Sequence, residues 1–193
     1  MRLIAILMFI SLLTSCNFNN KPFETELIEC FNSKILKKTS DSSFNVFKEA
    51  IKFENLLIEN GIIRNNSKEE YLRLFNKVEN NEVFIDQDIK KSISSFYFTL
   101  SPFTIDLFYA CPKEILRKEE NKANKKLLSL VLLYDNIQDT GVGNLGEVKN
   151  LIMSIDKVDF RNTVYRCPVT IILLMNLYNS CCGEKLENLK ILD

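Results

Sequence analysis

Apolar residues recur at intervals of three or four along most of the chain beyond residue 21, and this spacing is typical of amphipathic α-helices. The segment 22–38 shows it most regularly, because its apolar residues keep a strict four-residue spacing. These residues are Phe23, Leu27, Phe31 and Ile35, with Ile28 and Leu36 widening the stripe. No alternating strand pattern recurs as it would in a β-sandwich or barrel. The pattern predicts an all-α fold that begins with a helix over 22–38.

Polar residues and a glycine mark the ends of the next two predicted helices. The second helix begins at Ser42 or Ser43, either of which would act as the N-cap by accepting a hydrogen bond from a free backbone amide. It ends before Gly61, because glycine readily adopts the left-handed backbone conformation that often follows the last turn of a helix. The third helix begins at a capping box, since Ser67 and Glu70 have the S-x-x-E spacing in which the hydroxyl and the carboxylate each satisfy a backbone amide.

Pro102 divides the next part of the chain. A fourth helix starts at Asp86 or Asp88 and stops at Ser101, because a residue that precedes proline disfavours helical geometry. Ser101 and Pro102 also suit the first positions of a helix. We therefore expect a short fifth helix through Ile105 and Tyr109.

A strongly charged stretch over 113–126 grades into an apolar run over 127–134. We interpret both as one long helix whose first half is exposed to solvent, since a charged run is most often the solvent-exposed surface of a helix. A binding role for the charged stretch is the alternative. Three glycines follow and predict a turn before a helix over about 145–155. They are Gly141, Gly143 and Gly146. The sequence around them matches neither the dinucleotide-binding pattern G-x-G-x-x-G nor the P-loop, the two glycine-rich motifs that bind phosphate.

The segment 168–181 is apolar around nearly its whole circumference, which in a globular domain indicates a helix surrounded by others. Pro168 would begin this helix. A buried strand is the alternative, because 169–172 are all β-branched. We predict a single-domain bundle of about six to nine helices around this buried C-terminal helix.

Composition narrows the possible functions. The length of 193 residues supports one domain, and the 25 Lys and Arg balance the 25 Asp and Glu, which argues against nucleic-acid binding. The absence of His removes imidazole catalysis and every His-containing metal site. No familiar catalytic motif is present. We therefore expect no catalytic residue, no cofactor and no metal.

The N-terminus has the layout of a secretory signal. A basic start is followed by an apolar run over 3–13 that is too short to cross a bilayer, and then by two small residues. The sequence Leu13, Thr14, Ser15, Cys16 resembles the lipobox of bacterial lipoproteins. The resemblance implies cleavage before Cys16 and acylation of this cysteine. An ordinary thiol after a conventional signal is the alternative.

This resemblance predicts three parts in the chain. Residues 1–15 would be the signal peptide, 16–21 a lipidated tether, and 22–193 the helical domain. Several acyl chains hold a protein on a membrane more firmly than one, because each buried methylene adds to the affinity. We therefore expect the protein in the cell envelope, anchored to a membrane through lipid, with the periplasm-facing leaflet as the default.

Five further cysteines cannot all form disulfides with one another, so at least one thiol stays free. They are Cys30, Cys111, Cys167, Cys181 and Cys182. Their spacing matches no C-x-x-C redox or zinc motif. We interpret the adjacent Cys181 and Cys182 as small apolar residues at a helix end; a disulfide with either of them is the alternative.

The segment 159–167 holds the most distinctive polar residues, just before the buried helix. Arg161, Tyr165 and Arg166 are candidates for binding a partner, because Arg and Tyr are common in interface hot spots. The alternative is that they pair with acidic residues and cap neighbouring helices.

Together these features favour a non-enzymatic protein-binding module in the bacterial envelope, for which an immunity protein that neutralises a delivered toxin is one form. The partner itself is not identified by the sequence. One alternative is a carboxylate-dependent envelope hydrolase that uses Asp156 with Asp159, or Asp135 with Asp139. Another is a structural accessory subunit of an envelope complex.

Overall fold

The computed structural model describes residues 22–39, 43–104 and 109–182. Over these ranges the chain forms nine α-helices, two short 3-10 helices and no strand, which confirms the predicted all-α fold. The α-helices are α2 (Phe23–Thr39), α3 (Val46–Glu59), α4 (Lys68–Glu79), α5 (Gln87–Leu100), α6 (Cys111–Leu116), α7 (Lys125–Thr140), α8 (Leu145–Ser154), α9 (Lys157–Phe160) and α10 (Thr163–Cys181). The 3-10 helices are η1 (Ser101–Phe103) and η3 (Glu119–Asn121).

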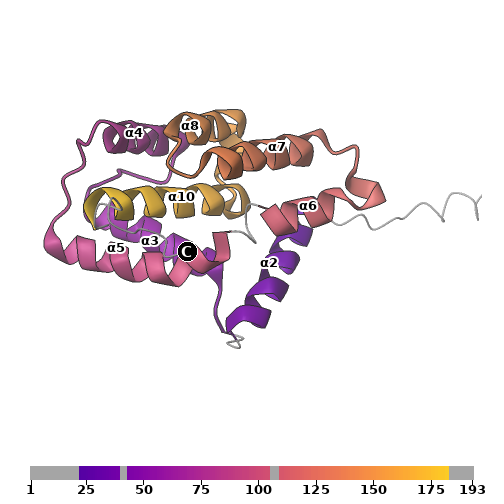
Figure 1. Cartoon of the computed structure of the whole chain (residues 1–193), viewed down its shortest axis with the longest axis horizontal. Helices are drawn as coiled ribbons and strands as arrows, with labels where there is room; N and C mark the ends of the chain where they lie inside the picture. The colour runs from indigo at the N-terminus through magenta and orange to yellow at the C-terminus, as the bar shows by residue number, and fades with distance from the viewer. Residues whose placement is uncertain (1–21, 40–42, 105–108, 183–193) are drawn as a thin grey trace, which may run out of the picture.

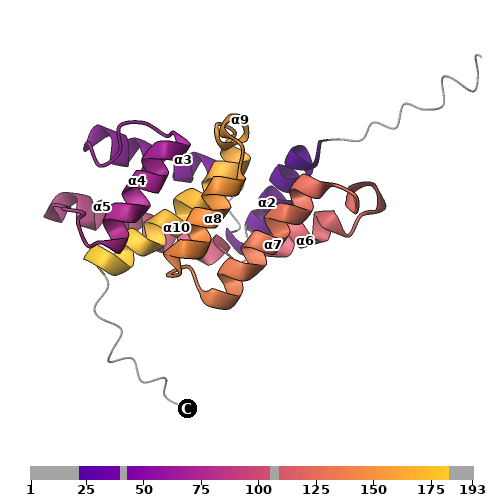
Figure 2. The ribbon, with the colours of Figure 1, turned by 90° about the horizontal axis from the view of Figure 1, so that it is seen from above.

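Helix α10 is the centre of the domain (Figures 1 and 2). It packs against α3 and α5 and also contacts α2, α4, α8 and α9. Every residue from Val164 to Leu174 is buried, so no side of the helix in this stretch faces solvent. This explains its apolar circumference and confirms both the helix over 169–174 and its central position.

The other helices form two groups beside α10. In Figure 2, α3, α4 and α5 lie on one side, and α2, α6 and α7 lie on the other. Helix α8 contacts both α4 and α7, so it connects the two groups across α10. Because both groups bury their apolar stripes against shared neighbours, the buried residues form one continuous core.

The start of α3 differs from the prediction. Asn45 is the N-cap, and its side chain accepts a hydrogen bond from the backbone amide of Lys48 at 3.0 Å. Ser43 lies before the helix, and Ser42 lies outside the described residues. The predicted C-terminal glycine is confirmed, since Gly61 has a φ of +68°, a value that L-residues with a side chain rarely adopt.

The capping box at α4 is only half formed. Ser67 caps the helix by accepting from the amide of Glu70 at 3.4 Å, as predicted. The Glu70 carboxylate instead accepts from the amide of Arg64 at 3.0 Å, while the Ser67 amide donates to Asn65. At α5 the N-cap is Asp86, one of the two predicted residues, and the helix ends before Ser101 as expected.

Two predicted helices have different bounds. The long helix predicted over the charged stretch is wrong, because the chain turns between α6 and α7. Within this turn the side chain of Asn121 donates to Glu26 at 2.8 Å, and Asn124 caps α7 by accepting from the amide of Leu127 at 3.1 Å. These contacts satisfy polar groups that a straight helix would direct to solvent.

The last helix begins five residues earlier than predicted. Asn162 is its N-cap and accepts from the amide of Val164 at 3.0 Å, so Pro168 lies inside α10 and not at its start. The predicted short helix after Pro102 begins as η1, and residues 105–108 of that prediction lie outside the described residues.

A disulfide between Cys30 and Cys111 joins α2 to α6. Cys167, Cys181 and Cys182 are free, which confirms that the cysteines do not all pair. In the part of the chain that the structure describes, no helix is both long and apolar enough to span a membrane.

Candidate functional site

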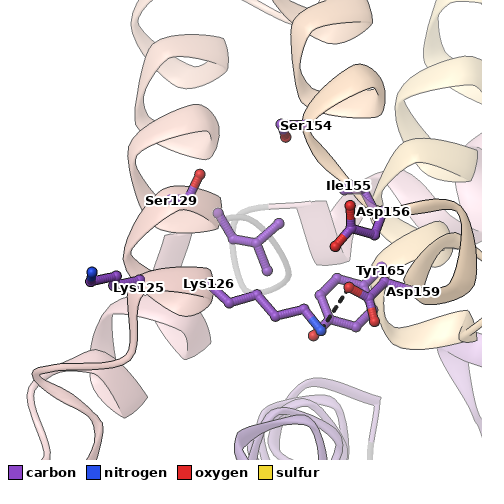
Figure 3. Close-up of a pocket in the computed structure, with 9 residues that line it drawn as sticks. Lys125, Lys126, Ser129, Ser154, Ile155, Asp156, Asp159 and Tyr165 are labelled. Atoms are coloured by element: carbon purple, nitrogen blue, oxygen red, sulfur yellow. Dashed lines mark ion pairs between the residues drawn. The ribbon is translucent and has the colours of Figure 1, made fainter.

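A pocket of about 250 Å³ lies between the start of α7 and the region where α8 gives way to α9 (Figure 3). Helices α7 and α8 pack against each other after the turn at Gly141, which brings the end of α8 close to the start of α7. The N-terminal part of α10 completes the wall. The lining residues are Lys125, Lys126, Ser129, Leu130, Ser154, Ile155, Asp156, Asp159 and Tyr165.

Lys126 crosses the pocket and connects four helices. Its Nζ lies 2.7 Å from Oδ2 of Asp159 and 3.8 Å from Oε1 of Glu24, and it sits over the ring of Tyr165 at 4.7 Å from the centroid. The hydroxyl of Tyr165 donates to Glu24 at 2.6 Å. Burial and this hydrogen bond raise the pKa of Tyr165, so the hydroxyl stays protonated and remains a donor at neutral pH.

Asp156 and Asp159 line this same pocket, so the first of the two predicted carboxylate pairs does converge. In Figure 3 the carboxylate of Asp156 points into the space between α7 and α9, while Asp159 is held by Lys126. Neither Asp135 nor Asp139, the second predicted pair, lines this pocket, and Asp135 forms an ion pair with Lys113 of α6 at 2.9 Å.

The residues predicted to bind a partner do not form one exposed patch. Tyr165 is 2% exposed and Arg166 is 5% exposed, so neither contributes to an exposed surface, whereas Arg161 is exposed. The first turns of α10 direct both buried side chains into the domain. The alternative interpretation holds for Arg166, whose Nη1 donates to the carbonyls of Phe160 at 3.0 Å and Arg161 at 2.8 Å at the end of α9.

Arg166 belongs to a buried polar network that the sequence analysis missed. Its Nε lies 2.6 Å from Oε1 of Glu54 in α3. The hydroxyl of Tyr71 donates to the same carboxylate and lies 2.7 Å from the hydroxyl of Thr170. Burial and the neighbouring Glu54 charge raise the pKa of Tyr71. The sequence does indicate a buried charge here, since Glu54 falls between Ala50 and Leu57 on the apolar stripe of α3.

The sequence analysis also missed an aromatic cluster on α5 and α10, in which Phe98 is exposed and Tyr97 and Tyr178 are half-buried. The ring of Phe98, 67% exposed, packs edge-on against Tyr97 and Tyr178, and these two tyrosines stack with centroids 3.9 Å apart. Phe84, just before α5, is 91% exposed. The signal was again in the sequence, because Phe98 lies off the apolar stripe that Ile93 and Leu100 define.

The polar groups of the pocket and of the buried network mostly bind one another. In the pocket the Lys126 ammonium is shared by two carboxylates, and in the network the Glu54 carboxylate accepts from three side chains. The Cys167 thiol is buried, and burial raises its pKa, which makes it a poor nucleophile. These arrangements favour structural support over group transfer.

The chain matches no protein-family model, no curated protein and no solved structure.

Proposed function

We propose that this protein is a lipid-anchored component of the bacterial envelope whose helical domain binds another protein. Two observations support the location. The sequence around Cys16, which lies outside the described residues, resembles a lipobox. The Cys30–Cys111 disulfide supports the same compartment independently, because disulfides persist in oxidising environments and are rare in the bacterial cytosol.

The observation that carries the binding function is the aromatic cluster in which exposed Phe98 packs on half-buried Tyr97 and Tyr178, together with exposed Phe84 near the other end of α5. Aromatic side chains dominate the binding energy of many interfaces, and their exposure to water is unfavourable unless a partner covers them. Two of these rings are more than half exposed although the domain has a large core. A protein partner that covers α5 is therefore the best-supported ligand.

An immunity protein that blocks a delivered toxin is the more specific form of this proposal. A small anchored binding domain on the outer side of a membrane would meet a toxin as it arrives. In this form, cells that lack the protein are killed by the captured partner and cells that carry it survive.

The test is capture of partners by the tagged, membrane-anchored protein, with three point variants for comparison. Phe98→Ala and Phe84→Ala should each reduce the yield of a stoichiometric partner at least severalfold. Leu132→Ala is the matched control, since Leu132 is also exposed, at 56%, but lies on α7. Recovery of no stoichiometric protein, or equal recovery with all three variants, would contradict the proposal.

A second candidate function is supported by the convergence of Asp156 and Asp159 on one pocket. Glycoside hydrolysis needs two carboxyl groups about 5 to 9.5 Å apart, one of which donates a proton. In this chain Lys126 neutralises Asp159, so that reaction would first require the ion pair to open. Turnover of envelope glycans that is abolished by Asp156→Asn would favour the hydrolase over the binding module.

A further inference from the structure

We propose that the end of the domain next to Pro22 docks on the bilayer, with α9 and the segment 118–126 against the lipid headgroups. This inference rests on the proposed acylation of Cys16, and it goes further by assigning one face of the domain to the membrane. The opposite end, with the connection between α4 and α5, is then directed away from lipid.

The first argument is the length of the tether. Six residue steps separate Cys16 from Pro22, and a chain of any conformation spans at most about 3.5 Å per residue. Pro22 can therefore lie no more than about 20 Å from an acylated Cys16. A folded domain of this length has a diameter of roughly 40 Å. The tether is shorter than the domain, so it restricts which face can meet the membrane.

The second argument is the set of residues that surround the start of α2. Glu24, two residues after Pro22, accepts from Tyr165 and pairs with Lys126, and Lys126 also pairs with Asp159 of α9. These contacts place α9 beside the start of α2.

The segment 118–126 is fixed at the same place through Glu26. The Glu26 carboxylate accepts from Lys118 at 3.0 Å and from Asn121 at 2.8 Å. Figure 2 shows the start of α2 between α9 and the connection from α6 to α7. Helix α2 therefore begins within this face.

The third argument is the chemistry of this face. Val158 on α9 is 75% exposed, which suits an apolar contact at the interface between headgroups and acyl chains. The segment 118–126 carries four lysines, of which Lys118, Lys122 and Lys126 pair with Glu26, Glu119 and Asp159, so its attraction to anionic headgroups is small and comes chiefly from Lys125. Either contribution alone is weak. The tether makes them effective, because it holds the face at a high local concentration next to the lipid.

The position of the exposed aromatic residues agrees with this orientation. The connection between α4 and α5, which carries Phe84, lies at the end of the domain far from α2 and from the connection between α6 and α7 (Figures 1 and 2). A domain docked through α9 therefore presents Phe84 to the aqueous side.

The chain contains no Trp, so a single introduced Trp reports its surroundings without background. The full-length acylated protein would carry either Val158→Trp or Phe84→Trp and would be reconstituted into vesicles of phosphatidylethanolamine and phosphatidylglycerol. Some of the lipid would be brominated near the headgroup to quench Trp fluorescence. Both positions are exposed, so neither substitution disturbs the core, and equal thermal unfolding of the two variants would verify this.

We expect the Trp at position 158 to be quenched at least severalfold more than the Trp at position 84, and its emission to shift to the blue. Equal quenching of the two, or no quenching at position 158 in protein that co-sediments with the vesicles, would overturn the docking surface alone. A protein that has no acyl mass and does not co-sediment would overturn the proposed anchor, and with it this inference. The two failures are therefore distinguishable.

Discussion

The guanidinium of Arg166 and the carboxylate of Glu54 form a buried ion pair that joins α10 to α3 across 112 residues of sequence. Both side chains are at most 6% exposed. Removing two charges from water is costly, so such a pair adds little net stability compared with apolar residues of the same size. Helix α10 is apolar around most of its circumference, and this pair marks the face that contacts α3.

Breaking this pair on one side should be strongly destabilising. Arg166→Met leaves the Glu54 carboxylate buried without its cation, and we expect a loss of about 3 to 5 kcal/mol in the free energy of unfolding. The double variant Glu54→Met, Arg166→Met should recover most of that loss, because no buried charge remains. Urea denaturation of the three proteins measures this. A double variant that is less stable than Arg166→Met would contradict the argument.

The Cys30–Cys111 disulfide should stabilise the domain mainly by lowering the conformational entropy of the unfolded chain. Its two cysteines are 81 residues apart, and closing a loop of this length lowers the entropy of the unfolded state by an amount worth about 4 kcal/mol. We expect the double variant Cys30→Ser, Cys111→Ser to unfold at lower denaturant concentration, and reductant to have the same effect on the natural chain. If reductant leaves the midpoint of the natural chain unchanged, the disulfide is absent or has no such role.

Glu70 should make the domain sensitive to acid. Hydrogen bonds from Arg73 and Arg64 lower its pKa from 4.5 to about 2 in the folded state. The ionised carboxylate therefore stabilises the fold above about pH 4.5, and this contribution is lost as the pH falls towards 2. Both arginines also contact solvent, so we expect an effect of about 1 to 2 kcal/mol.

The variant Glu70→Gln tests this contribution. Between pH 4.5 and 2 its stability should depend less on pH than that of the natural chain, as measured by urea denaturation. Glu59→Gln, on the exposed end of α3, is the matched control and should keep the natural dependence. Identical pH profiles for Glu70→Gln and the natural chain would refute the assignment.

The free thiols should differ in reactivity. Cys167 is 1% exposed and burial raises its pKa, so maleimide should label it only after unfolding. Cys181 is partly exposed, but burial and a hydrogen bond with Cys182 raise its pKa to about 12, so it should react more slowly than a peptide thiol. Mass spectrometry of labelled peptides would report both rates. Rapid labelling of Cys167 in the folded protein would contradict the buried position of this thiol.

Local features of the fold could be predicted from the sequence because their causes are local. The apolar circumference of α10 depends on which residues follow one another, and so do the N-cap at Ser67 and the left-handed Gly61. Each of these was predicted correctly, and the boundary before Ser101 was correct for the same reason. The conformational preference of a few adjacent residues was enough.

Contacts between distant segments could not be predicted in this way. Because five cysteines follow Cys16, at least one thiol must stay free, but this number does not show that Cys30 and Cys111 are the pair. The turn inside the charged stretch depends on Glu26, which lies 95 residues from Asn121. The burial of Arg166 depends on its partner Glu54, which belongs to another helix. Of the candidate sites, only the convergence of Asp156 and Asp159 was anticipated.

We propose that acyl chains on Cys16 hold a helical binding domain at the membrane, and the intact mass of the protein purified from the membrane fraction is the decisive measurement. We expect a chain that begins at Cys16 and carries the added mass of a diacylglycerol, with or without a further acyl group. A chain that begins elsewhere, or one with an unmodified Cys16 in the soluble fraction, would contradict it.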